Sequence, residues 1–124
     1  MKCKMTARAR VNPTEDLDKV ITAISNIFNF DELEIGDGFI SVTGNEESLI
    51  NLRESLKNRK IRDTAARMFI KGSEGKLINF SLSKQAALVS VPNFVDREMS
   101  ALGEIDVTIE TDDIETFIEW MTAK

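Results

Sequence analysis

The sequence predicts an α+β domain in which a mainly antiparallel sheet carries helices packed on one face. Segments with the period-two alternation of strands are intermixed with segments that have helical spacing, and no regular βαβ order joins them. The chain has 124 residues, of which 42% are hydrophobic and 30% are charged, as in an ordinary soluble globule. This length is sufficient for a buried core, so we expect a single domain over residues 1–124.

The strands are predicted from alternation of apolar and polar side chains. Asp37-Gly38 separates two short apolar runs, which is typical of a β-hairpin. Alternation also runs through the first residues of the chain, where the outer side is basic. The predicted strands are 3–11, 33–35, 39–43, 76–82 and 105–109.

The helices are predicted from apolar stripes and from capping residues. The first helix follows Asn12-Pro13-Thr14-Glu15, and either Asn12 or Thr14 is its N-cap. Asp112 or Asp113 caps the last helix. Residues 83–91, which follow the predicted strand 76–82, form either a short helix or an irregular crossing.

Residues 53–71, which we call the basic segment, are the main candidate for function. They hold seven cations and two acids in a chain of net charge −5. Clustered like charges repel one another and usually meet an anionic partner. The interval from Leu56 to Ile61 is wrong for one straight helix, so we expect two helical pieces with a break near Asn58.

On the second piece, at about 100° per residue, Lys60, Arg67 and Lys71 share an exposed arc. Their spacing suits the phosphates of a nucleic acid. Two alternatives stay open. The segment meets an acidic protein partner, or it is a solvated helix face with local pairs around Asp63.

The first predicted strand adds a second group of cations. Lys2, Lys4, Arg8 and Arg10 lie on one side of it with no acid among them. Such a row can follow a phosphate backbone, or it can protect an edge strand against aggregation. The row reinforces the basic segment only if the two are neighbours in space.

Several classes of function are disfavoured by residues that the chain lacks. It has no His and one Cys, which excludes His-dependent triads and a thiolate zinc site within one chain. We therefore expect no enzyme, no metal and no cofactor. The charged N-terminus, the single Cys3 and the absence of an apolar run of roughly 18 residues indicate a cytoplasmic protein with no membrane partner.

The motifs also resemble those of a known family. P-T-E-D with K-V (13–20), I-x-D-T-A-x-R (61–67), N-F-S-L-S-K-Q-A-A (79–87), N-F (93–94) and L-G-x-I-x-V-x-I (102–109) occur in order. With them the chain resembles an archaeal family described as predicted RNA-binding proteins or predicted exosome subunits. The resemblance implies a fold like that of the ribosomal protein that binds 5S RNA, and a homodimer. Two features depart from the family: Ser90 stands where a glycine is expected, and residues 120–124 lack a proline–threonine ending.

Together these observations predict a non-catalytic RNA-binding protein that acts through a basic surface. Lys84 and Gln85, within the resembling motif, offer a cation and an amide for phosphate or base, although Gln85 could instead satisfy backbone groups. The alternative is a dimeric interaction module or assembly factor, with the basic segment against the acidic residues 98–119 of a second subunit. The predicted RNA contacts are Lys60, Arg62, Arg67, Lys71, Lys84, Arg8 and Arg10.

Overall fold

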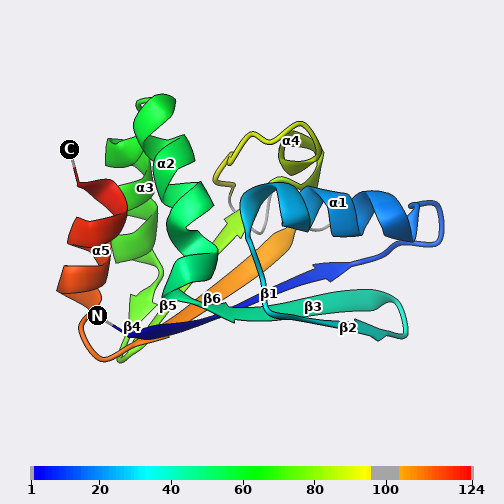
Figure 1. Ribbon diagram of the computed structural model, residues 1–124, viewed down its shortest axis with the longest axis horizontal. Coiled ribbons are helices and arrows are strands. Elements are labelled where there is room, and N and C mark those ends of the chain that lie inside the picture. Colours follow the sequence, from blue (N-terminus) through cyan, green and yellow to red (C-terminus); the bar gives the residue numbers. More distant parts are fainter. Residues whose placement is uncertain (1, 96–103, 124) are drawn as a thin grey trace.

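The computed structural model describes residues 2–95 and 104–123, which form one antiparallel sheet with helices on a single face (Figure 1). The strands lie in the order β2-β3-β1-β6-β5-β4, and every neighbouring pair that is hydrogen-bonded is antiparallel. The first strand of the chain is therefore central. The strands are β1 (Cys3–Arg10), β2 (Glu32–Gly36), β3 (Phe39–Asn45), β4 (Ser73–Glu74), β5 (Leu77–Leu82) and β6 (Ile105–Thr111).

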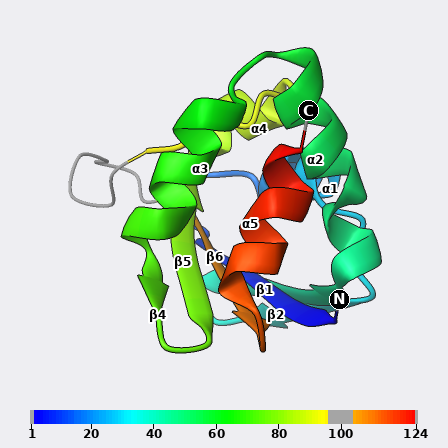
Figure 2. The same cartoon turned by 90° about the vertical axis from the view of Figure 1, so that its left-hand side faces the viewer.

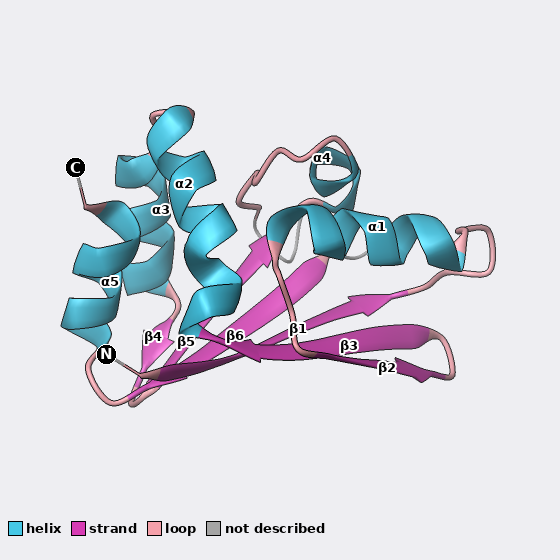
Figure 3. Ribbon diagram, viewed as in Figure 1, coloured by secondary structure: helices cyan, strands magenta, loops and turns pink. Residues whose placement is uncertain are grey.

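The helices form a second layer in two groups. Helices α1 and α4 lie over one end of the sheet, and α2, α3 and α5 stand over the other end (Figures 1 and 2). Figure 3 shows that the opposite side of the sheet carries no helix within the described residues; we call it the open face. The helices are α1 (Leu17–Ile27), the 3-10 helix η1 (Glu46–Leu49), α2 (Ile50–Asn58), α3 (Arg62–Lys71), α4 (Lys84–Leu88) and α5 (Ile114–Thr122).

The core lies between the sheet and these helices. In β1 the odd-numbered side chains are buried and the even-numbered ones point to the open face, as the alternation predicts. At the α3 end, Phe69 makes edge-to-face contacts with Phe80, Phe94 and Phe117 at centroid distances of 5.1, 5.6 and 5.8 Å. The predicted α+β class, with helices on one face of an antiparallel sheet, is confirmed.

The start of α1 differs from the prediction. Its N-cap is Asp16, whose side chain accepts from the Asp18 amide, and neither Asn12 nor Thr14 takes this role. Asn12 instead donates through its backbone and side-chain nitrogens to Glu15 Oε1, at 3.0 and 2.6 Å. The N-P-T-E sequence, which resembles a capping box, therefore forms a turn before the helix. At α5, Asp113 is the N-cap, which resolves the alternative left open there.

The end of α4 explains one departure from the family pattern. Ser90 has a φ of 63°, in the left-handed region where glycine is favoured. The Val91 and Ser90 amides donate to the carbonyls of Ala86 and Ala87, at 2.8 and 2.9 Å, which is the Schellman arrangement at a helix end. The glycine expected at this position would fit that backbone without strain.

Candidate nucleic-acid interface

The break in the basic segment is a tight turn between α2 and α3. The amide of Ile61 donates to the Leu56 carbonyl at 3.2 Å, and that of Lys60 donates to Lys57 at 3.3 Å. This is a second Schellman arrangement, and Lys60 takes its left-handed position with a φ of 57°. The predicted break near Asn58 is thus confirmed, and its cause is a helix end that turns the chain back toward the sheet.

The turn presents three cations, Lys57, Arg59 and Lys60, which we call the turn cluster. All three side chains are exposed. Within residues 2–95 and 104–123, no hydrogen bond or ion pair engages any of them. Lys57 and Lys60 also line a surface depression together with Asn58, Arg62 and Asp63. One acid in this neighbourhood does not balance the cations, so the turn is locally basic.

Along α3 the predicted stripe is shorter than expected. Arg67 and Lys71 are exposed and lie one turn apart, and Arg67 donates to the Thr64 hydroxyl at 3.4 Å. Lys60 does not belong to this stripe, because the helix begins only at Arg62. The prediction of one arc through Lys60, Arg67 and Lys71 is therefore wrong, and the reason is the left-handed backbone at residue 60.

Two arginines of the basic segment serve the C-terminal end of α5. Arg53 Nε donates to the Trp120 carbonyl at 2.6 Å, and its guanidinium lies 5.6 Å from the Trp120 ring centroid. Arg62 donates to the Ala123 carbonyl at 3.1 Å. The last carbonyls of a helix have no partner within the helix and carry partial negative charge, so cations stabilise them. Part of the basic segment is thus used in packing α5.

The cations of β1 lie on the open face, on the other side of the sheet from α2 and α3 (Figure 1). Lys4 is directly opposite Glu110 of β6, and Arg8 is directly opposite Asp106. The guanidinium of Arg8 also stacks over the Phe39 ring at 3.9 Å. Arg8 and Arg10 are therefore not neighbours of the turn cluster, and acids from β6 offset the charge of their strand.

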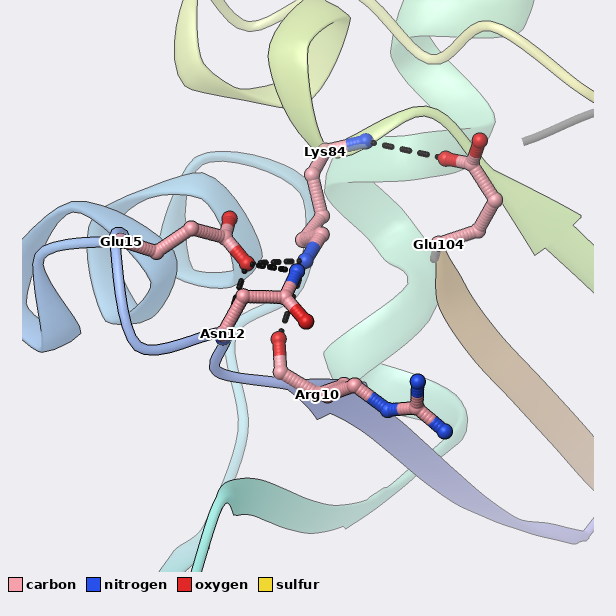
Figure 4. A network of polar contacts seen from close by, with 5 residues as sticks. All are labelled: Arg10, Asn12, Glu15, Lys84 and Glu104. Atoms are coloured by element: carbon pink, nitrogen blue, oxygen red, sulfur yellow. Dashed lines mark hydrogen bonds and ion pairs between the residues drawn. The ribbon is translucent and has the colours of Figure 1, made fainter. Parts of the chain in front are cut away.

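Lys84 is buried, so the prediction that it contributes to an exposed basic surface is wrong. Its side chain is 7% exposed and its ammonium lies 2.8 Å from Glu15 Oε1 and 2.9 Å from the Arg10 carbonyl oxygen (Figure 4). The Lys84 amide donates to Glu104. Burial by itself raises the pKa of Glu15, but hydrogen bonds from Lys84 and Asn12 and the charge of Lys84 outweigh it and hold that pKa below its ordinary value.

The structure describes few groups poised for other chemistry. Cys3 is buried, and burial raises the pKa of its thiol to about 11, so the thiolate is disfavoured. Among the described residues, no group of three His, Cys, Asp or Glu side chains could hold a metal ion. No helix within them is both long and apolar enough to cross a membrane. Of the acidic stretch 98–119, the first six residues lie outside the described part.

Lys57 and Arg59 are the candidate residues that sequence reasoning passed over. The signal was present, since the five-residue interval between Leu56 and Ile61 cannot be helical throughout. Residues in such an interval form a turn, and turns expose their side chains. The same observation that located the break could therefore have located the turn cluster.

Comparison with solved structures supports the fold at the level of the whole chain. A crystal structure of a UPF0201 protein superimposes with a TM-score of 0.86 and 36% identity, covering 98% of this chain and 94% of that one. The UPF0201 protein from Methanococcus jannaschii gives a TM-score of 0.83 and 34% identity, with coverages of 98% and 93%.

Comparison with protein sequences leads to the family. A UPF0201 protein from Methanothermobacter thermautotrophicus is 41% identical over 118 residues, covering 95% of this chain and 89% of that protein. One from Saccharolobus solfataricus is 37% identical, with coverages of 98% and 88%. Neither name indicates a catalytic activity. A family model described as RNA binding matches residues 4–111. The predicted resemblance is confirmed, and the chain belongs to this RNA-binding family, together with the archaeal UPF0201 proteins.

Proposed function

We propose that this protein binds RNA through the turn cluster, with Arg67 and Lys71 on the adjoining face of α3 and Arg62 at the edge. The proposal rests on the positive charge of the turn cluster, which no described side chain compensates. Lys57, Arg59 and Lys60 are exposed and unengaged within the described residues, in a chain that is acidic overall. The match to a family described as RNA binding supports the nature of the partner.

The mechanism is neutralisation of backbone phosphates with release of the counterions bound to the RNA. Lysine and arginine at a turn can approach adjacent phosphates without a formed groove. No aromatic side chain lines the depression beside the turn cluster, and Trp120 is only partly exposed, beside Arg53. Stacking on unpaired bases is therefore not available there. The surface suits a structured RNA, recognised by shape and backbone.

Fluorescence anisotropy with an RNA hairpin and a single-stranded RNA of equal length tests this function. If about four phosphates are engaged, log affinity should fall against log salt with a slope of about −2.8 to −3.6. The hairpin should bind more tightly than the single strand. Absence of binding, or binding that does not respond to salt, would contradict the proposal, and a preference for the single strand would contradict shape recognition.

A dimeric interaction module is the competing function, and one observation favours it. Several carboxylates at the junction of β6 and α5 are exposed and could meet the turn cluster of a second copy. In that case sizing would show a homodimer whose turn cluster is protected from lysine-directed labelling, with no nucleic acid in its ultraviolet spectrum. A role in a larger RNA-processing complex of the cytoplasm, such as a predicted exosome subunit, requires RNA binding as its first condition. The exposed carboxylates of β6 and α5 that could meet the turn cluster of a second copy are Glu110, Asp112, Asp113, Glu115 and Glu119.

A further inference from the structure

Strand β2 is an outer strand of the sheet, and its outer backbone edge has no partner strand within the described residues. A two-residue loop, Asp37-Gly38, connects it to β3, and Gly36 is opposite Phe39. In such a hairpin the closing pair is hydrogen-bonded and the following pairs alternate. The amides and carbonyls of Leu33 and Ile35 therefore point away from β3 and present a free ladder to solvent.

The side chains of β2 are unusual for a strand next to a core. Leu33 and Ile35 are 40% and 56% exposed, although their cross-strand neighbours Val42 and Ile40 are fully buried. The helix layer thus covers β3 but leaves β2 uncovered. On the open face, Glu32 and Glu34 are both exposed, and within the described residues neither side chain has a hydrogen bond or an ion pair.

Elsewhere in the sheet, a similar row of acids has cations opposite it on the neighbouring strand. Strand β6 also alternates acids on the open face with buried apolar residues on the other, and its neighbour β1 places Lys4 and Arg8 opposite Glu110 and Asp106. Strand β2 repeats the acidic and apolar alternation of β6, but it has a basic neighbour on neither side. Opposite charges that face each other across a strand pair stabilise the pairing.

We propose that β2 is a docking edge for an extended protein segment in which lysine or arginine alternates with aliphatic residues. Added as an antiparallel strand, the segment places its cations opposite Glu32 and Glu34 and its aliphatic side chains over Leu33 and Ile35. Its backbone completes the free ladder, which is the β-augmentation mode of peptide recognition. The site is separate from the turn cluster, and it does not rest on RNA binding.

A second copy of β2 fits this edge less well. Antiparallel self-pairing that sets Leu33 opposite Ile35 sets Glu34 opposite its own copy. Pairing Leu33 with itself sets Glu32 opposite Glu34 twice. Like charges directly opposite are destabilising, so both of these self-pairings are disfavoured, and charge complementarity favours a basic partner.

The experiment uses the full chain labelled with nitrogen-15 and a synthetic peptide of about seven residues that alternates lysine with valine. The control peptide has the same composition with lysines and valines in separate blocks. We expect the alternating peptide to protect the Leu33 and Ile35 amides from hydrogen exchange, while the block peptide does not. Reversing both charges with Glu32→Lys and Glu34→Lys should weaken binding about tenfold or more.

Leu33→Pro separates the backbone contribution, because proline removes an outward-facing amide that β3 does not use. It should abolish peptide binding while the rest of the amide spectrum stays unchanged. If that variant fails to fold, the charge-reversed variant decides, since both its positions are exposed. Equal protection by the two peptides, or undiminished binding after charge reversal, would overturn the proposal. So would protection of Leu33 and Ile35 without peptide in a concentration-dependent dimer.

Discussion

Strand β1 carries three cations and the α2–α3 turn carries four, but the fold treats the two groups differently. In β1, Lys4 and Arg8 are opposite acids of β6, and Arg8 also covers Phe39. At the turn, only the Arg62 side chain donates to a described acceptor, and the side chains of the turn cluster stay unengaged. Local charge in the sequence is thus a poor measure of charge at the surface, because the strand neighbours that offset it are about a hundred residues away.

The largest expected effect comes from removing charge at the turn. Lys57→Gln, Arg59→Gln and Lys60→Gln together should lower RNA affinity by about 100-fold or more at low salt and flatten the salt dependence, because three phosphate contacts are lost. The matched variant neutralises β1 with Lys4→Gln, Arg8→Gln and Arg10→Gln.

The β1 variant should change RNA affinity by about threefold or less, since acids of β6 already offset that strand. Anisotropy titrations on the same RNA hairpin measure both variants, and circular dichroism checks that both are folded. An equal loss in the two variants would break the contrast between the regions.

Lys84 extends the comparison to a cation that is buried. Lys84→Met should lower the free energy of unfolding by about 2–3 kcal/mol, because it leaves Glu15 without its cation and removes a donor to the Arg10 carbonyl. The control is Lys76→Met, which removes an ion pair with Asp112 whose side chains are 72% and 92% exposed. Lys76→Met should change the free energy of unfolding by no more than about 0.5 kcal/mol. Urea unfolding of both variants, beside the parent, gives the two values.

The same ion pair predicts a dependence on pH. The pKa of Glu15 is lowered from its ordinary value in the folded protein, so the carboxylate stabilises the fold above that ordinary pKa, and this contribution is lost as the pH falls through the folded pKa. Unfolding of the parent and of Glu15→Gln should therefore converge in acid and diverge near neutral pH. A constant difference across the acidic range would show that Lys84 does not depend on the charge of Glu15.

The smallest effects concern the two left-handed residues. Lys60→Gly and Ser90→Gly should each stabilise the protein by about 0.5–1 kcal/mol, since glycine adopts a positive φ without steric strain. Only Lys60→Gly should also weaken RNA binding, by a few-fold, through loss of one phosphate contact. Thermal unfolding and anisotropy on both variants separate the two roles. A change in RNA affinity on Ser90→Gly would contradict this assignment.

The elements of this fold are largely readable from the sequence, while the surface is not. The alternation in β1 and the apolar interval around Asn58 are local periodicities, which can be read directly from the sequence. The register that sets Arg8 against Asp106 and the burial of Lys84 beside Glu15 depend on contacts about 70 to 100 residues apart in sequence. No local pattern encodes those distances. The match to a family described as RNA binding was anticipated by resemblance, but the separation of the candidate cations onto two sides of the sheet was not.

The central place of β1 has a consequence for folding of the chain. Strand β1 is hydrogen-bonded on one side to β6, which spans Ile105–Thr111 and is the last of the described strands in sequence order. Until β6 pairs with it, one edge of β1 stays unpaired. Contacts between distant parts of a chain also slow folding, because a long loop must close first. We therefore expect the pairing of β1 with β6 to form late in folding, after the hairpin of β2 and β3.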